Sequence, residues 1–249
     1  MKTSTSFAGS CRRFLQAGIT LTELLVTLSL CSGLMAMTGP ALVLARQKAH
    51  ELRCLNSVRN VSVASTLFSD DNSDSLVPHA LLGATGKHTL LPNRFLTYWP
   101  DLLGQYVSSP ENFRCPNARS TNESAVSIGL AVGSLAPYLS ATARQWIPVS
   151  AVAKPGQTFM FGDAGWIDPR SARSRNADMW EADESRPSGS WTIRVPSDRA
   201  FNLLPTRAWN RHAPGLSAGF VDGHVESMRA GEIGFDRPLG HAANLWDLK

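Results

Sequence analysis

An uncharged, apolar segment near the N-terminus is the most regular pattern in the chain. Residues 19–44 carry a single charged side chain, that of Glu23. A helix of this length extends about 39 Å at about 1.5 Å per residue, and a bilayer core is about 30 Å thick. The pattern therefore predicts a membrane-spanning helix over residues 19–45. A lone carboxylate in such a helix is costly, so Glu23 is a candidate functional residue.

The helical pattern continues beyond the apolar segment but becomes one-sided. From residue 41 to about Phe68, apolar or small residues recur at intervals of three and four, which predicts an amphipathic helix packed on a globular head. The Asx-rich run Ser69–Ser75 is expected to end this helix. The stripe predicted to face the head consists of Leu52, Leu55, Val58, Val61 (or Ser62), Ser65 and Phe68.

Short patterns further along the chain predict isolated strands and one helix. Thr158–Phe161 and Trp191–Val195 are typical of strands, and Phe95–Val107 is typical of a short amphipathic helix. Residues 120–150 are rich in small side chains and give no readable pattern. The charged stretch Pro169–Ser190 has no period and is expected to form a long exposed loop.

A hairpin near the C-terminus is the clearest strand pattern. Leu216–Val221 and His224–Met228 flank Asp222-Gly223, a dipeptide typical of two-residue type I′ turns. Such a turn would pair Val221 with His224. The side chains then expected on the core face are those of Leu216, Ala218, Phe220 and Val225.

Together these elements predict an α+β fold. One long N-terminal helix, membrane-spanning in its first half, is expected to pack by its second half on a small antiparallel sheet with loop insertions. The predicted division of the chain is a leader at residues 1–18, a membrane helix at 19–45 and a head at 46–249. The head has about 200 residues, which is the size of one domain.

The residues around Gly18 form a sequence motif that is distinct from the hydrophobic pattern. A basic leader precedes Gly18, and the run ITLTELLV follows with Glu23 as the fifth residue after the glycine. This arrangement resembles the N-terminus of type IV pilins and type II secretion pseudopilins. The resemblance implies cleavage between Gly18 and Ile19 by a prepilin peptidase, N-methylation of Ile19, and pairing of Glu23 with the N-terminal amine of a neighbouring subunit. An ordinary secretory signal peptide and a plain transmembrane anchor are the alternatives.

The C-terminal part carries a matching pattern. His212 is followed, after nine intervening residues, by Asp222-Gly223. This H-x9-DG region, at residues 212–223, resembles the C-terminal signature of a large group of prepilin-like proteins. Other segments resembling the same group are RCLNSVRN after the anchor, FRCPN at 113–117, VAKPGQTFMFGDAG at 152–165 and the closing NLWDLK.

The cysteines fit an exported head. Cys54 and Cys115 would be the only cysteines beyond the membrane, since Cys11 lies in the leader and Cys31 in the predicted membrane helix. In an oxidising compartment they are candidates for one disulfide, with two buried free thiols as the alternative. Their spacing matches no zinc-binding pattern.

Four other residues are candidates for a divalent metal or for acid–base chemistry: Asp163, His212, Asp222 and His224. Simpler interpretations also exist, because Asp222 suits the turn and His212 can hydrogen-bond the hairpin. The sequence has no G-x-S-x-G, H-E-x-x-H or phosphate-binding loop. Neither catalysis nor an organic cofactor is therefore expected, while a divalent metal stays open.

The predicted function is structural: a pseudopilin or minor pilin of a type II secretion or type IV pilus-like filament. Its partners would be the prepilin peptidase, other subunits and the bacterial inner membrane, with the head in the periplasm. Nucleic-acid binding is not expected, because the leader supplies three of the four net positive charges. The alternatives are an anchored module whose Pro169–Ser190 loop and tryptophans bind a glycan, and a secreted hydrolase.

Overall fold

The structure is a computed structural model that describes residues 19–82, 90–91, 96–118, 126–133, 135–139, 146–186, 188–212 and 215–248. The predicted leader, including Gly18, lies outside the described residues. The chain divides into two compact units that meet between Arg46 and Gln47. We name residues 19–46 the stalk and residues 47–249 the head, and describe each by itself.

The stalk is the first part of helix α1 (Leu21–Asp71), which is 51 residues long. Its large apolar side chains are exposed, among them Leu28 at 58% and Met37 at 80%. By length and composition α1 can cross a membrane. The prediction of a long, apolar N-terminal helix is therefore confirmed. Apolar side chains exposed in this number call for a lipid or protein environment.

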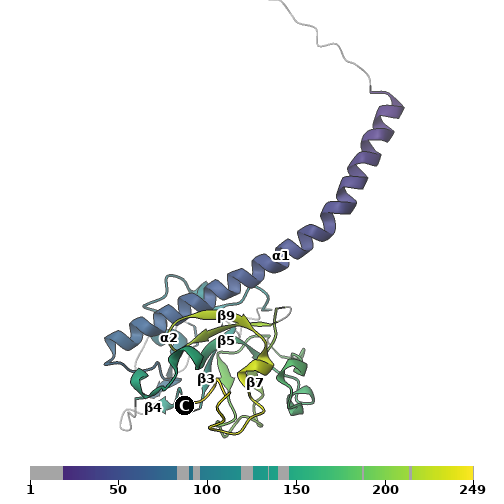
Figure 1. The fold of residues 1–249 in the computed structure, drawn as a ribbon. Helices are drawn as coiled ribbons and strands as arrows, with labels where there is room; N and C mark the ends of the chain where they lie inside the picture. The colour runs from purple at the N-terminus through teal and green to yellow at the C-terminus, as the bar shows by residue number, and fades with distance from the viewer. Residues whose placement is uncertain are drawn as a thin grey trace, which may run out of the picture. The chain divides into compact units, whose positions relative to one another are not determined.

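The second part of α1 belongs to the head and packs on its main sheet (Figure 1). The predicted stripe is correct from Val58 onward but wrong at Leu52, which is 52% exposed. The buried face also includes small side chains, because α1 closely approaches strand β8 (Leu216–Phe220), where a Cβ on Gly219 would collide with Ser62. The buried face consists of Cys54, Ser57, Val58, Val61, Ser62, Ala64, Ser65, Phe68 and Ser69.

Nine strands occur among the described residues of the head. They are β1 (Ala80–Leu82), β2 (Leu96–Tyr98), β3 (Ile128–Val132), β4 (Tyr138–Leu139), β5 (Phe159–Trp166), β6 (Thr192–Arg194), β7 (Thr206–Ala208), β8 and β9 (Val225–Met228). The main sheet has the order β6-β3-β5-β8-β9 with β7 paired to β5, and a smaller sheet has the order β2-β1-β4. The pairs β3–β6 and β1–β4 are parallel. The α+β class is confirmed, although the sheets are mixed rather than purely antiparallel.

The helix expected over Phe95–Val107 is much shorter in the structure. Only Trp99–Leu103 is helical, as α2, and the residues just before it form β2. Pro100 stands in the first turn of α2, where its fixed φ favours a helix start. The described 3-10 turns are η1 (Pro110–Phe113), η2 (Val149–Ala151), η3 (Pro155–Gln157), η4 (Ser171–Arg173), η5 (Ala177–Met179) and η6 (Ala230–Ile233).

The hairpin is confirmed, but its predicted register is wrong by one residue. Gly219 pairs with Val225, and the connection is a three-residue turn that ends at Gly223, with a φ of 90°. This geometry suits a type I turn followed by a left-handed glycine. A shift of one residue moves side chains to the other face, so Val225 lies opposite Gly219 and is only partly buried against the core, while Met228 takes a buried place opposite Leu216.

Two central strands also differ from the prediction. The strand expected at Thr158–Phe161 continues to Trp166, so Asp163 lies in the middle of β5 rather than after its end. Strand β3 falls in the stretch without a readable pattern, because all five of its residues are buried and its sequence does not alternate. The strand predicted at Trp191–Val195 is confirmed as β6.

Candidate functional site

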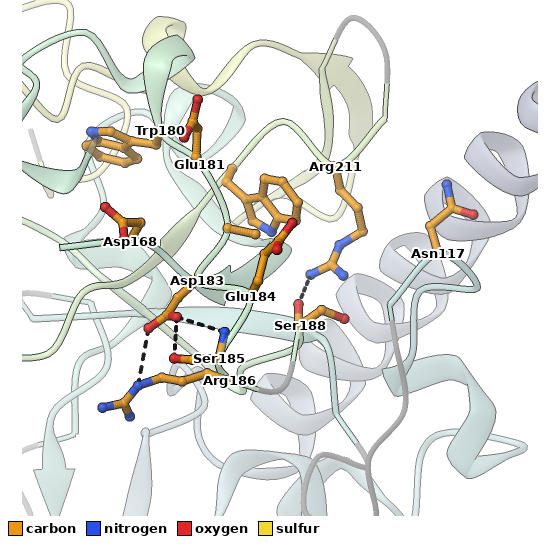
Figure 2. A pocket seen from close by; sticks show the side chains of 12 residues that line it. Asn117, Asp168, Trp180, Glu181, Asp183, Glu184, Ser185, Arg186, Ser188 and Arg211 are labelled. Atoms are coloured by element: carbon orange, nitrogen blue, oxygen red, sulfur yellow. Dashed lines mark hydrogen bonds and ion pairs between the residues drawn. The ribbon is translucent and has the colours of Figure 1, made fainter. Parts of the chain in front are cut away.

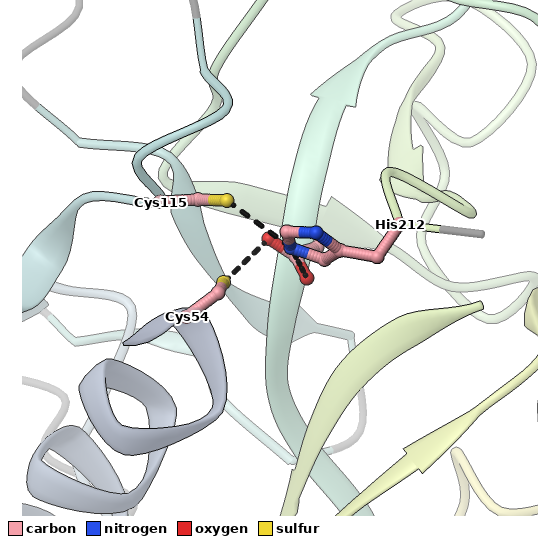
Figure 3. A group of neighbouring side chains, drawn as sticks. Cys54, Cys115 and His212 are labelled. Carbon is pink, nitrogen blue, oxygen red and sulfur yellow. Dashed lines mark hydrogen bonds and ion pairs between the residues drawn. The ribbon is translucent and has the colours of Figure 1, made fainter. Parts of the chain in front are cut away.

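A buried group of two cysteines, an aspartate and a histidine lies where α1 meets the main sheet (Figure 3). Cys54 comes from α1, Cys115 from the loop after η1, Asp163 from β5 and His212 from the segment before β8. Each residue is at most 6% exposed. We name this group the Cys–Asp–His cluster.

The donor atoms of the cluster converge. Cys54 Sγ donates to Asp163 Oδ1 over 3.0 Å, and Cys115 Sγ lies 3.3 Å from His212 Nε2. His212 Nε2 lies 3.5 Å from Asp163 Oδ2, and all four donor atoms lie within 4.8 Å of one another. Both cysteines are free thiols in this structure. The disulfide between them stays a prediction, and the fold does bring the two side chains together.

The cluster favours a thiolate on one cysteine only. A hydrogen bond from Cys54, and a second one from His212, lower the pKa of Cys115 to about 6 although burial opposes the change. The pKa of Cys54 is raised by its interaction with Cys115, by burial and by the nearby charge of Asp163. Burial lowers the pKa of His212, but the hydrogen bond to Cys115 and the charge of Asp163 outweigh it, so this pKa is raised.

Three neighbours fix the orientation of the cluster. The backbone N–H of Ser217 donates to Asp163 Oδ2 over 2.9 Å, and Arg211 Nε lies 3.4 Å from Asp163 Oδ1. The side-chain amide of Asn117 lies 3.3 Å from His212 Nδ1. The aspartate is thus held by a cation and a backbone donor, as a buried carboxylate requires.

Only two of the four predicted metal candidates belong to the cluster. Asp163 and His212 come together, whereas Asp222 and His224 are on the hairpin turn, where Asp222 Oδ1 lies 2.6 Å from His224 Nδ1. Strand β8 separates the two groups, and its five residues extend about 16 Å. The four candidates therefore do not form one site. The role of Asp222 in the turn is supported, because Asp222 Oδ1 also accepts the N–H of His224.

The sequence analysis missed that the cysteines complete this group. Metal-ligand patterns such as C-x2-C detect ligands that are close in sequence. Here the four residues come from separate elements, and only the fold brings them together. A usable signal was present, since Cys54, Cys115, Asp163 and His212 each lie in a segment that resembles the prepilin-like group.

A second feature of the head is a surface cavity of about 800 Å³, shown in Figure 2. Its lining includes Trp180, Asp183, Arg186 and Arg211, which come largely from the charged stretch at residues 169–190. That stretch was expected to form a long exposed loop, but the structure buries Trp180 within it, which is 5% exposed. Arg211 lines the cavity and also contacts Asp163, so the cavity lies next to the cluster.

Glu23 has a structural partner at the start of α1. The Thr20 N–H and hydroxyl donate to Glu23 Oε2 over 2.9 and 2.7 Å, and the Glu23 N–H donates back to Thr20 Oγ1 over 3.3 Å. This arrangement is a capping box, T-x-x-E, which satisfies backbone donors at a helix N-terminus. The carboxylate therefore has a local role that the sequence analysis did not consider.

Comparisons with protein-family models, with curated proteins and with solved structures find no match to this chain.

Proposed function

We propose that the chain is a structural subunit, a pseudopilin or minor pilin, of a type II secretion or type IV pilus-like filament. The observation that carries the proposal is the difference between the two parts of α1. The stalk exposes apolar side chains along its length, and the following part packs on the head. A helix that is apolar on all sides suits a bilayer before assembly and a filament core afterwards.

In this proposal a prepilin peptidase cuts between Gly18 and Ile19 and methylates the new N-terminus. The stalk then holds the chain in the inner membrane with the head in the periplasm, until the subunit is extracted into a filament. The role is structural and involves no catalysis. The resemblance of the residues around Gly18 to prepilins supports this route of processing.

Glu23 is the residue through which we propose that subunits recognise one another. Both bonds from Thr20 reach Oε2, so Oε1 is the atom that we assign to the N-terminal ammonium of the next subunit. Such a pair would be buried among apolar stalks. Removal of one partner from a buried ion pair leaves an uncompensated charge and costs about 3–5 kcal/mol.

Two variants separate the pairing from the helix cap. Glu23→Ala removes both the charge and the capping box, whereas Glu23→Gln removes only the charge, since glutamine also serves in a capping box. We expect Glu23→Ala to be cleaved normally but to be absent from filaments, and Glu23→Gln to fall between Glu23→Ala and the wild type. The measurement is fractionation of cells into membrane and sheared-filament pools, with the cleaved fraction determined by mass.

The matched control is Thr20→Ala, which removes the cap and keeps the carboxylate. It should enter the filament pool. If Glu23→Gln reaches wild-type amounts in that pool while Glu23→Ala is absent, the charge is not needed for assembly. Glu23 would then act only as a helix cap. Wild-type amounts of Glu23→Ala would remove the assembly role altogether.

A second candidate function, glycan binding by an anchored head, is favoured by the cavity of about 800 Å³. Trp209 supplies a partly exposed aromatic side chain at its wall, and Asp183 and Glu181 supply hydrogen-bond acceptors. The test is retention of the detergent-solubilised chain on immobilised polysaccharides, with Trp209→Ala as the matched variant. Retention that Trp209→Ala abolishes would favour this function, and equal retention of both forms would exclude the cavity as the binding site.

A further inference from the structure

We propose that the Cys–Asp–His cluster is a structural zinc site. Its ligands are Cys54 Sγ, Cys115 Sγ, His212 Nε2 and one oxygen of Asp163. The inference rests on the head alone, so it stands or falls independently of the filament proposal.

The distances within the cluster fit a tetrahedral ion. Zinc–ligand bonds of about 2.0–2.3 Å place the ligand atoms of a tetrahedral site roughly 3.3–3.8 Å apart. In the structure Cys54 Sγ lies 3.0 Å from Asp163 Oδ1, Cys115 Sγ lies 3.3 Å from His212 Nε2, and His212 Nε2 lies 3.5 Å from the other carboxylate oxygen, Asp163 Oδ2. All four donor atoms lie within 4.8 Å of one another, so movements of about 1 Å or less would bring them to coordination distance.

The types of ligand select the metal. Two thiolates and an imidazole favour zinc, whereas magnesium and calcium require oxygen ligands. A disulfide between Cys54 and Cys115 would use the same sulfurs but would leave their polar neighbours less well satisfied. Without a thiol hydrogen, Cys54 could no longer donate to the fully buried carboxylate of Asp163.

The charges of the buried site balance when zinc is bound. Two thiolates and Asp163 carry three negative charges against the two positive charges of the ion. The guanidinium of Arg211, 3.4 Å from Asp163 Oδ1, supplies the remaining positive charge. His212 coordinates through Nε2 in its neutral form. Coordination by two thiolates and a neutral imidazole displaces protons from the cluster, so the affinity should fall as the pH falls.

The outer contacts of the site suit a metal-bound histidine. When His212 coordinates through Nε2, its Nδ1 carries a proton and needs an acceptor. Asn117 lies 3.3 Å from Nδ1, and a flip of its side-chain amide presents an oxygen there. The backbone N–H of Ser217 holds the second carboxylate oxygen in place.

The burial of the ligands points to a structural role. Four protein ligands, each at most 6% exposed, leave no open coordination position for a substrate. A smaller cavity of about 260 Å³ borders the cluster, because Cys115 is part of its lining together with Arg53 and Arg114. Zinc would fasten α1 to the sheet by linking four segments that are far apart in the sequence.

The test is metal analysis of the full chain, purified in detergent without chelators, by inductively coupled plasma mass spectrometry. We expect one zinc per chain in the wild type and in two matched controls, Cys31→Ser in the stalk and His224→Gln on the hairpin turn. Cys54→Ser, Cys115→Ser and His212→Gln should lose the metal. Equal zinc in the ligand variants and the wild type would show that the metal is adventitious and would overturn the proposal.

Intact mass under native, non-reducing conditions identifies the competing state. A gain of one zinc with the loss of two protons supports the site, whereas the loss of two hydrogens without metal reveals a disulfide and overturns it. Free thiols without metal, which do not take up added zinc, also overturn it.

A further measurement on the wild type does not depend on whether the variants fold. Exchange of zinc for cobalt should give the intense visible bands of a tetrahedral ion and the charge-transfer band of thiolate ligands. A spectrum typical of an octahedral oxygen site would contradict the ligand assignment. Asn117→Ala, which removes the contact to His212 Nδ1, should keep these bands and weaken zinc binding roughly 10–100-fold.

Discussion

The two parts of α1 are one helix in sequence and two different environments in the structure. In the stalk, Leu28 is 58% exposed and a Cβ added to Gly33 would meet no atom within 4 Å. In the head, Val58 is fully buried and a Cβ added to Gly219, on the strand facing α1, would collide with Ser62. The sheet of the head buries apolar side chains of the second part of α1. The apolar side chains of the stalk would need a lipid or protein partner to bury them.

The difference teaches that apolarity alone does not locate a core. The stalk is the more apolar part, yet it is the exposed one. The head buries serines as well as apolar residues, because small side chains let a helix lie close to a sheet. The same type of substitution should therefore change the free energy of unfolding of the head when it lies in the head, and leave it unchanged when it lies in the stalk. The head can be followed by fluorescence, because all seven tryptophans lie in it.

The largest expected contrast comes from truncation of a large apolar side chain. Phe68 is 4% exposed, and its ring lies 6.3 Å from those of both Tyr106 and Trp146. Phe68→Ala should lower the free energy of unfolding of the head by about 3–5 kcal/mol. Leu28→Ala should leave it unchanged. Tryptophan-detected urea unfolding measures both, and an equal loss in the two variants would break the comparison.

A single methyl group gives a smaller contrast. Gly219→Ala places a Cβ against Ser62 and 2.9 Å from Val58 Cγ1, so α1 must shift from the sheet. Overpacking of this kind costs roughly 1–3 kcal/mol. Gly33→Ala has open space and should leave unfolding of the head unchanged. Wild-type stability of Gly219→Ala would show that the close approach of α1 to β8 is not a constraint.

Mild acid should also act on the head through a buried histidine. His79 is 1% exposed, and burial, together with the charge of Arg194, lowers its pKa to about 3 although Asp198 opposes this. Since the unfolded chain binds a proton near pH 6.5 and the folded chain does not, stability is greatest above that pH and falls below it. The loss attributable to His79 at pH 5 is about 2 kcal/mol.

The control for acid is His79→Gln, which cannot titrate. Unfolding of both proteins between pH 7 and pH 5 should show a shallower decline for the variant. The same decline in both would assign the acid sensitivity to other groups. The comparison between variants separates the contribution of His79 from those of other groups that titrate in this range.

The sequence predicted the features that depend on local pattern. The length of α1 and the positions of β6, β8 and β9 followed from periodicity and from the Asp222-Gly223 turn. The hairpin register did not, because a glycine after an aspartate suits both two- and three-residue turns. Strand β3 was missed because a strand that is buried on both faces does not alternate.

For the candidate sites as well, the sequence identified single residues but not how they are grouped. Glu23 was found because a charge stands out in an apolar run, while its capping partner Thr20 was overlooked. The Cys–Asp–His cluster could not be predicted as a unit, since its composition depends on how α1 and β5 are placed in three dimensions. Residue type identified Asp163 and His212, and only the fold separated them from Asp222 and His224.

The most direct test of the central claim, that the chain is a processed filament subunit, is the identity of its mature N-terminus. The chain should be isolated from membranes of a bacterium with an active prepilin peptidase and analysed by peptide mass spectrometry. We expect a chain that begins at N-methylated Ile19, and a Gly18→Arg variant that keeps its leader. A wild-type chain that retains residues 1–18, or that begins beyond Leu30, would contradict the account.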